Sequence, residues 1–225
     1  MVGTGRAGTA LAGRLRGAGL AVTSGREIDP AAELVLLAVP DAAISEVARA
    51  APIGPWVAHV SGATSVTALA PHERRFSLHP LQTLTTDRGP EQLEGAWAAL
   101  TFETAEAGAM AQWLAERLGL QPFVLADADK ALYHAGAAMA SNFLVTLYRV
   151  AARLLAESGA PPEALVPLMR RVIENGFQLT GPIARGDWST VEAHLAAIGA
   201  RTPDVEPVYR ALAEATRAVA AEDRS

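Results

Sequence analysis

Lys130 and His134 are separated by four residues, and Asn142 follows further along the same stretch. Four positions are close to one turn of an α-helix, so a helix would place Lys130 and His134 on one face. An ammonium group and an imidazole in this arrangement could supply a proton donor and an oriented partner for reduction of a carbonyl. Asn142 could position a substrate oxygen. The alternative is a solvated Lys130 at a helix start, with His134 and Asn142 capping or bridging helices.

Two further histidines lie in apolar segments that favour strands. His79 precedes a proline, which favours an extended backbone, and a histidine at a strand end could exchange protons or hydrogen-bond a substrate. A structural histidine in a turn is the alternative. His59 lies inside the segment 56–60, so we expect it to be packed in the core. Ser61 and Gly62 follow that segment and are better placed to border a ligand.

The first residues contain the spacing G-x-G-x-x-G, written out as Gly3-Thr4-Gly5-Arg6-Ala7-Gly8. In a dinucleotide site, the first glycine allows a tight turn, the second lets the backbone approach a diphosphate, and the third lets the helix pack close to the sheet. The helix that follows would point its free N–H groups at the phosphates. The motif therefore predicts a dinucleotide site, although a purely structural turn could have the same spacing.

The choice of dinucleotide depends on the end of the next expected strand, over residues 20–23. A site for NAD usually has an acidic residue there, which binds the ribose hydroxyl. Here Ser24 and Arg26 occupy the position, and a hydroxyl with a guanidinium suits a 2′-phosphate. The sequence therefore favours NADP over NAD. In the alternative, Arg26 is solvated and Glu27 is the ribose ligand.

Only Met1 and Val2 precede the first glycine, although a strand of about 5 residues is expected there. We therefore expect the natural start of the protein to lie upstream of Met1. Mass spectrometry of the natively expressed protein would test this, because a native terminus at Met1 would contradict it.

The pattern of apolar segments predicts an α/β domain over residues 1–126, with a Rossmann-type, mostly parallel sheet. The run 33–40, apolar from Leu34 onward, is typical of a strand buried on both faces, and its end at Val39 and Pro40 should face the cofactor. The expected elements, in chain order, are a helix over 7–16, strands over 20–23 and 33–40, a helix over 42–50, strands over 56–60, 75–83 and 97–102, a helix over 104–118 and a strand over 122–125.

Residues 127–225 predict an all-α domain for substrate binding or dimerisation. One long helix is expected over 128–157 and a second over 161–179. A capping box at Ser189 predicts the start of the third, and Thr202 with the following proline predicts the start of the fourth. The apolar stretch 135–155 favours a homodimer through this domain, with burial against the chain's own first domain as the alternative.

Composition excludes several classes of protein. The net charge is −5 and no cluster of basic residues stands out, which argues against a nucleic-acid partner. No apolar run approaches the roughly 18 residues of a membrane helix, and the N-terminus lacks a secretion signal. The chain has no cysteine, so it has neither disulfides nor a thiolate metal site, and no metal is expected. We expect a soluble, cytoplasmic protein.

Seven short segments are spread over nearly the whole chain: Gly3-x-Gly5-x-x-Gly8, Val39-Pro40-Asp41, His59-Val60-Ser61-Gly62, His79-Pro80-Leu81-Gln82, Lys130-x-x-Tyr133-His134, Ser141-Asn142 and Thr180-Gly181-Pro182-x-x-Arg185-Gly186-Asp187. Their combination resembles the Rossmann-like proteins that carry the DUF2520 domain. That family is similar in architecture to the 6-phosphogluconate dehydrogenase-like superfamily, which includes pyrroline-5-carboxylate reductase and prephenate dehydrogenase. In the β-hydroxyacid dehydrogenases of the superfamily, an asparagine follows the helix lysine by four residues, and here His134 stands at that place.

The residues and the resemblance together predict an NADP-dependent oxidoreductase that transfers a hydride between the nicotinamide and a small carbonyl, imine or hydroxy-acid substrate. The glycine-rich loop, Ser24 and Arg26 would hold the cofactor, and Ser61, Gly62 and His79 would border its nicotinamide. A protein that binds NADP without turning over a substrate, and so senses the nucleotide, is the second hypothesis. Binding of NADPH without turnover across a broad substrate panel would favour it.

Overall fold

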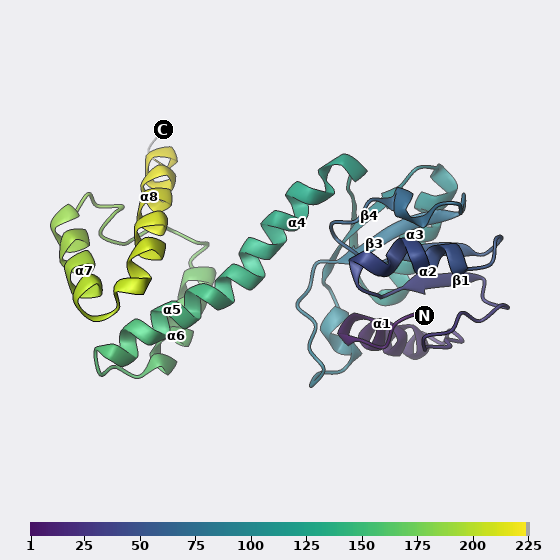
Figure 1. Cartoon of the computed structure of the whole chain (residues 1–225), viewed down its shortest axis with the longest axis horizontal. Coiled ribbons are helices and arrows are strands. Elements are labelled where there is room, and N and C mark those ends of the chain that lie inside the picture. The colour runs from purple at the N-terminus through teal and green to yellow at the C-terminus, as the bar shows by residue number, and fades with distance from the viewer. Residues whose placement is uncertain (224–225) are drawn as a thin grey trace. The chain divides into compact units, whose positions relative to one another are not determined.

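The computed structural model describes residues 1–223 and divides into two compact units, Met1–Ser141 and Asn142–Ser225 (Figure 1). The first unit is an α/β unit, and the second is helical. The division falls later in the chain than the expected boundary between residues 126 and 127, because the turns around Lys130 belong to the α/β unit. None of the helices among the described residues combines the length and the apolar character needed to span a membrane.

The α/β unit is built on a five-stranded sheet in the order β1-β2-β3-β4-β5. Pairing is parallel except between β3 and β4, which are antiparallel. The prediction of a mostly parallel sheet is confirmed, and each of these strands lies where the apolar pattern places one. Their bounds are Leu34–Leu37 for β1, Trp56–His59 for β2, Arg75–Pro80 for β3, Trp97–Phe102 for β4 and Gln121–Val124 for β5.

The first residues extend this sheet beyond β1. Val2 forms parallel bridges to Leu37 on one side and to Gly25 on the other. The strand expected over residues 20–23 is wrong, since only Gly25 is paired in that region. Its neighbour in the sheet is the short segment around Val2, which offers few ladder partners, and the Arg16 side chain instead binds the carbonyl of Val22 through Nε and Nη2 at 3.1 and 3.0 Å.

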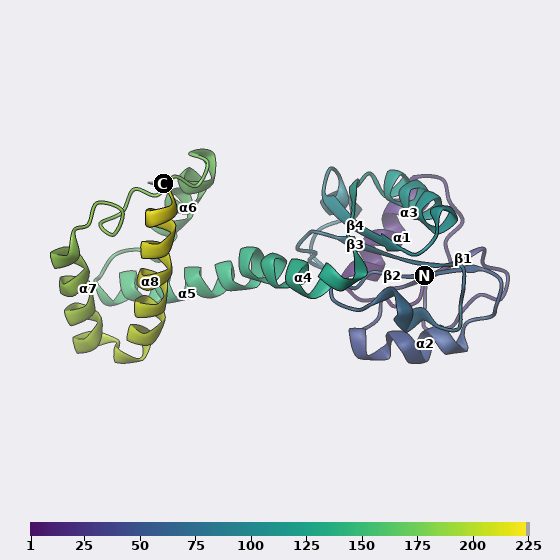
Figure 2. The same ribbon diagram turned by 90° about the horizontal axis from the view of Figure 1, so that it is seen from above.

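Helices cover both faces of the sheet (Figure 2). On one face, α1 (Arg6–Gly17) and α3 (Ala105–Leu118) pack with inward residues such as Leu36 and Phe76. On the other face, α2 (Ile44–Ala50) packs with Val35 and Leu37. Adjacent strand residues point to opposite faces, so a strand covered on both sides must be apolar throughout, as β1 is.

The ends of α1 and α3 lie within one residue of the predicted bounds, 7–16 and 104–118. Gly19 has a φ of 81° just beyond the end of α1. In α3 the Thr104 hydroxyl accepts a hydrogen bond from the backbone N–H of Ala107 at 3.2 Å, and Gly119 at the other end is left-handed with a φ of 72°. Glycine adopts this conformation without a steric penalty, which is why it ends the helix cleanly.

The helix expected over residues 128–157 contains one interruption in its α-helical hydrogen bonding. It begins as a 3₁₀ turn at Asp127–Asp129 and continues as α4 (Lys130–Ala138). A π-helical turn at Met139–Phe143 then leads into α5 (Leu144–Glu157). The prediction of an uninterrupted α-helix is therefore wrong at the π turn. Such turns accommodate an extra residue and often occur at functional sites.

The helical unit corrects two further expectations. Helix α6 (Leu165–Glu174) ends before residue 179, because Gly176 and Phe177 both have positive φ, at 67° and 60°. Helix α7 (Trp188–Arg201) begins one residue after Asp187, whose carboxylate accepts from the backbone N–H of Thr190 at 3.2 Å. The predicted cap at Ser189 is therefore wrong, because the aspartate takes that position.

The start of α8 (Glu206–Glu222) is close to the prediction. Thr202 precedes a 3₁₀ turn, Pro203–Val205, that leads into this helix. The hydroxyl of Thr202 does not act as a cap. Its Oγ1 is the only buried side-chain polar atom without a hydrogen-bond partner in the described part of the chain. The turn therefore starts at the proline, whose fixed φ suits the first position of a helix.

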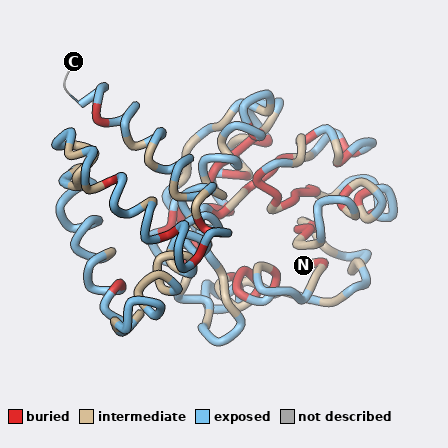
Figure 3. Tube along the Cα trace, turned by 60° about the vertical axis from the view of Figure 1, so that its left-hand side comes forward, coloured by how far each residue is buried: buried red, intermediate tan, exposed pale blue. Residues whose placement is uncertain are grey.

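Buried residues are concentrated in the α/β unit (Figure 3). In the helical unit, the described buried residues are few, namely Leu165, Val191, Ile198, Thr202, Val205 and Ala220. Several large apolar side chains of that unit are more than half exposed instead, including Phe143 at 60%, Leu168 at 60% and Phe177 at 72%. The helical unit therefore buries far fewer residues than the α/β unit does.

Candidate functional site

The three glycines of the opening loop have three different surroundings. Gly3 has a φ of 108°, and a Cβ there would lie 2.2 Å from the carbonyl oxygen of Ala38. At Gly8 a Cβ would lie 2.1 Å from the carbonyl oxygen of Gly3. At Gly5, by contrast, a Cβ would meet no atom within 4 Å. The protein itself therefore requires glycine at the first and third positions, whereas the second is open on its outer side.

The open glycine lies at the N-terminus of α1. Gly5 is the residue that precedes the helix, no side chain caps that end, and its first turn contains no acidic residue. The first N–H groups of a helix have no partner inside the helix. In α3 and α7 the side chains of Thr104 and Asp187 accept from one of these groups. Helix α1 therefore presents uncapped N–H groups in open space, and this arrangement fits the diphosphate of a dinucleotide.

The residues predicted to bind the 2′-phosphate lie next to the outer bridge of the sheet. Ser24 precedes Gly25, which pairs with Val2, and its hydroxyl accepts a hydrogen bond from Arg16 Nη2 at 2.8 Å. Arg26 and Glu27 are both exposed. Arg16 was not predicted as a site residue. The available signal was its place in the last turn of α1, eight residues before Ser24.

The carboxyl ends of the parallel strands bring the remaining predicted residues to one edge of the sheet. Val39 and Pro40 follow β1, Ser61 and Gly62 follow β2, and His79 lies near the end of β3. The segment before the glycine loop is parallel to β1, so the loop leaves the sheet at the same edge. Ligands of open α/β sheets bind outside this edge.

Two histidines meet at Gly62. A Cβ on this buried glycine would lie 2.7 Å from Cδ2 of His134 and 2.9 Å from Nε2 of His79. The two imidazole rings have their centroids 5.9 Å apart. Glycine at this position therefore lets both rings approach the loop after β2, and the structure brings together three of the residues that the sequence singled out.

Tyr133 completes this cluster, and its role was not predicted. Its hydroxyl lies 2.8 Å from Nδ1 of His79, and the two rings are nearly perpendicular at 86°. Phe123 of β5 also packs against the tyrosine, with ring centroids 5.9 Å apart. Burial raises the pKa of Tyr133 to about 12. The spacing Lys130-x-x-Tyr133 was the only sequence signal for this residue.

Lys130 is buried, with 1% of its surface exposed. Its ammonium donates to Oγ of Ser77 at 2.7 Å and to the carbonyl oxygen of Ser61 at 3.2 Å. Burial lowers the pKa of Lys130, and the charges of Asp127 and Asp41 oppose this shift. A solvated lysine at the helix start is therefore wrong. Lys130 links α4 to β3 and to the loop that contains Gly62.

His59 is completely buried, which confirms the expectation of a packed histidine. The backbone N–H of Ser61 donates to its Nδ1 at 3.2 Å, so Nδ1 is unprotonated and Nε2 carries the proton towards the carbonyl of Ser65 at 3.3 Å. Burial, together with the charge of Lys130, lowers the pKa of His59 to about 4. The neutral ring fixes the start of the loop after β2.

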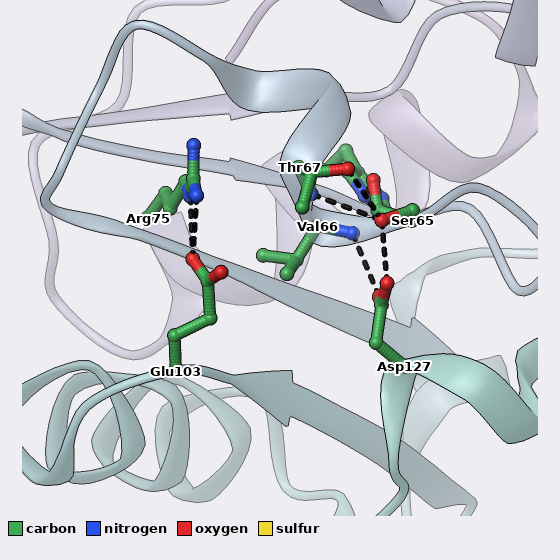
Figure 4. Close-up of polar contacts among 7 residues, drawn as sticks. Ser65, Val66, Thr67, Arg75, Glu103 and Asp127 are labelled. Atoms are coloured by element: carbon green, nitrogen blue, oxygen red, sulfur yellow. Dashed lines mark hydrogen bonds and ion pairs between the residues drawn. The ribbon is translucent and has the colours of Figure 1, made fainter.

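Polar contacts hold the rest of that loop. Ser61 donates through its hydroxyl to the Asp41 carboxylate at 2.8 Å, and the same oxygen accepts from the backbone N–H of Thr64 at 3.0 Å. The Asp127 carboxylate accepts from the hydroxyl of Ser65 and from the N–H of Val66 (Figure 4). Neither aspartate was predicted as part of the site.

An ion pair supports the neighbouring strands. Arg75 of β3 pairs with Glu103, which follows β4, at 2.7 Å, and Figure 4 shows the two side chains facing each other. Among the described residues, no group of three or more histidines, cysteines or acidic residues could hold a metal ion.

Asn142 is exposed and belongs to the second unit, where its carbonyl accepts a hydrogen bond from the Thr146 hydroxyl at 3.3 Å. Its part in the site stays a prediction. Ser141, the last residue of the first unit, donates instead to the carbonyl of Ala137 at 2.7 Å. The preceding turns of the same helix, with Lys130 and His134, are therefore the ones that contribute to the cluster.

Two family models match this chain. The family model described as a domain of unknown function (DUF2520) matches residues 97–216, and the model of a Rossmann-like domain matches residues 19–82. Because the first match covers more than half of the chain, this chain belongs to the DUF2520 family. None of the curated proteins matches the sequence.

Solved structures are similar over most of the chain. A Bacteroides fragilis protein, provisionally assigned as an NADP oxidoreductase, has a TM-score of 0.82 and 19% identity, with 96% of each chain covered. A protein from Thermotoga maritima has a TM-score of 0.71 and 27% identity over 85% of this chain and 79% of that chain. An NADH-preferring ketol-acid reductoisomerase from an uncultured archaeon has a TM-score of 0.61 and 15% identity, covering 99% and 82%. These likenesses establish the fold, a Rossmann-type unit followed by a helical region.

Proposed function

We propose that this chain is an NADP-dependent oxidoreductase that transfers a hydride between the nicotinamide and a small carbonyl, imine or hydroxy-acid substrate. The observation that carries the proposal is the open Gly5 at the uncapped start of α1. It lies on the same sheet edge as His79, Tyr133 and His134 around Gly62, which together form the Gly62 cluster. The provisional assignment of the Bacteroides fragilis protein supports the same class.

The opening loop would hold the diphosphate through backbone N–H groups. Thr4, Gly5 and Arg6 are exposed, so the backbone at this turn is accessible to a ligand, and the Arg6 guanidinium can add a charge-assisted hydrogen bond. Ala7 is the next residue of the helix, and its N–H is among the groups that lack an intrahelical partner. When bound, the nicotinamide supplies the hydride chemistry.

The preference for NADP rests on the segment after residue 22. The Ser24 hydroxyl is already oriented by Arg16, and Arg26 is exposed beside it in the sequence. A guanidinium binds phosphate through two parallel hydrogen bonds, which a ribose hydroxyl cannot match. We therefore assign the 2′-phosphate to Ser24 and Arg26, with Arg16 holding the serine in place.

The Gly62 cluster would border the nicotinamide and the substrate. His79 and His134 approach the loop that contains Gly62, and Val39 and Pro40 lie at the end of the adjacent strand. Lys130 is already engaged by Ser61 and Ser77, so in this proposal it fixes the position of the loop and contributes a positive charge to the site. Asn142 remains a candidate for orienting the substrate.

The first experiment is a calorimetric titration of the full chain with NADPH and, separately, with NADH. We expect both to bind and NADPH to bind more tightly. Bound protein is then tested for oxidation of NADPH with a panel of small carbonyls and imines. Tight binding without turnover across the panel would favour the sensing function, and absence of binding by both nucleotides would contradict the proposal.

The helical unit would form a homodimer in the cytoplasm. Its few buried residues and its exposed apolar side chains support this part of the proposal. Burial of such side chains contributes roughly 25 cal/mol for each Å² removed from water. Sedimentation velocity of the full chain should give the mass of two copies, and a monomer at micromolar concentration would contradict it.

A further inference from the structure

One nitrogen of the His79 ring makes a hydrogen bond, and the other faces Gly62. Nδ1 lies 2.8 Å from the hydroxyl of Tyr133, which is the only hydrogen bond of the His79 ring among the described residues. Nε2 and Cε1 face Gly62, where a Cβ would lie 2.9 and 2.8 Å from them. Nε2 has no hydrogen-bond partner among the described residues. Thr202 Oγ1 is the only described side-chain polar atom that is both fully buried and without a partner, so Nε2 cannot be fully buried. It is therefore reached by solvent.

The tyrosine hydroxyl retains its proton at neutral pH, because burial raises the pKa of Tyr133 to about 12. The only described hydrogen bond of that hydroxyl is the one to Nδ1 of His79. A protonated hydroxyl beside an imidazole nitrogen makes its hydrogen bond without help from solvent when it donates to the lone pair of that nitrogen. The imidazole proton must then be on the opposite nitrogen.

We propose that Tyr133 fixes His79 in the tautomer that carries its proton on Nε2, so that His79 presents a neutral N–H donor beside Gly62 to the oxygen of a bound carbonyl group. Tyr133 is thus a positioning residue, and His79 is the group that contacts the ligand. The assignment of the tautomer stands on its own. Its use towards a carbonyl group rests on the proposed oxidoreductase function.

Burial is the main reason that the His79 ring stays neutral. Burial lowers its pKa to about 4, and the charges of His134 and Lys130 on α4 act in the same direction. His59 on β2 adds to this effect, and Asp41 after β1 opposes it. A neutral imidazole that donates from Nε2 polarises a carbonyl without giving up its proton, which is suited to stabilising negative charge that develops on the oxygen.

The test is the histidine nitrogen spectrum of the ¹⁵N-labelled full chain, recorded without ligand at neutral pH. The expected result is a protonated Nε2 and an unprotonated Nδ1 for His79, unchanged as the pH is lowered to about 5, since the folded pKa lies below that value. A proton found on Nδ1 would overturn the proposal.

A second arm uses Tyr133→Phe, which removes the hydroxyl and keeps the ring that packs on Phe123. We expect a mixture of the two tautomers and a rise of the His79 pKa by at most about one unit, because a hydrogen bond that favours the neutral ring is lost. An unaltered His79 signal would contradict the role of Tyr133.

The chain contains a matched control. Nδ1 of His194 lies 2.7 Å from the hydroxyl of Tyr209 in the helical unit. Tyr209→Phe should therefore change the signals of His194 and leave those of His79 unchanged. Because none of these spectra requires a nucleotide, their outcome is separate from the titration with NADPH, which tests the proposed function by itself.

Discussion

Replacement of Gly5 by alanine should abolish tight binding of NADPH and leave the fold intact. The new Cβ would meet no protein atom within 4 Å, and the φ of Gly5 is −72°, a value that alanine adopts freely. The methyl group would instead occupy the open side of the loop, where the diphosphate has to approach the N–H groups of α1. The substitution therefore separates the ligand's requirement for glycine from the protein's own.

The expected change in stability is small. Alanine before the first turn of a helix is less favourable than glycine by roughly 0.5–1 kcal/mol. Removing a glycine restricts the unfolded chain and contributes about 0.4–1 kcal/mol in the opposite direction. We therefore expect the free energy of unfolding of Gly5→Ala to lie within about 0.5 kcal/mol of the wild-type value.

The expected change in affinity is large. A diphosphate held away from the loop loses hydrogen bonds to backbone N–H groups, each contributing roughly 1.5–3 kcal/mol when the partner is charged. Loss of two such bonds corresponds to at least about 3 kcal/mol, or a dissociation constant raised about 100-fold. Calorimetric titration with NADPH gives the constant, and thermal unfolding of the same samples gives the stability.

Two other glycines provide the controls. Gly17→Ala is the same change at the other end of α1, also with no atom within 4 Å of the new Cβ, and should bind NADPH as the wild type does. Gly8→Ala places a Cβ 2.1 Å from the Gly3 carbonyl and should destabilise the fold by about 3 kcal/mol. Wild-type affinity in Gly5→Ala would refute the assignment of the loop to the diphosphate.

Three further predictions follow from the same geometry. Arg26→Ala should weaken NADPH at least about tenfold and leave NADH within about twofold, measured by calorimetry; equal losses for both nucleotides would contradict the 2′-phosphate assignment. Lys130→Ala should lower the free energy of unfolding by about 1–3 kcal/mol in urea denaturation, since the Ser77 hydroxyl and the Ser61 carbonyl lose a buried donor; an unchanged value would be inconsistent with the buried contacts. His59 has a folded pKa of about 4 against 6.5 in the unfolded chain, so the unfolded chain binds the extra proton between these values. Protonation of the unfolded chain therefore lowers the free energy of unfolding by about 3 kcal/mol as the pH falls from 6.5 towards 4. His59→Gln should show a weaker decrease over that window, and parallel pH profiles of the two proteins would argue against the assignment.

The sequence pattern located most of the α/β unit because its signals are local. Within the segment 33–40, every residue after Glu33 is apolar, which only a strand covered on both faces requires. The three glycines were assigned different roles from spacing alone, and the structure has no room for a Cβ at the first and third but open space at the second. The predicted ends at residues 16 and 118 agree with the structure to within one residue, and Gly19 and Gly119 just beyond them have the positive φ that a single glycine supplies.

Errors occurred where a neighbour in space decided the outcome. The segment 20–23 has a composition suited to a strand, but its neighbour in the sheet is the short segment around Val2. Ser189 fits a capping pattern, but the Asp187 carboxylate accepts from the free N–H group of Thr190 and takes the position. In both places the local sequence was compatible with more than one structure, and a contact with another residue decided which structure formed.

What the amino-acid sequence determined by itself is the opening loop, the alternation of strands and helices, and the change to an all-α second half, since each depends on residues within one turn or one strand of each other. Only the tertiary structure decided that Tyr133 binds a histidine 54 positions away, and that the Lys130 ammonium is buried against Ser77, 53 positions away. Those contacts depend on the order and direction of the strands, which bring distant side chains to one edge of the sheet. Spacing along the chain does not encode such distances, and so the chemistry of the cluster follows from packing.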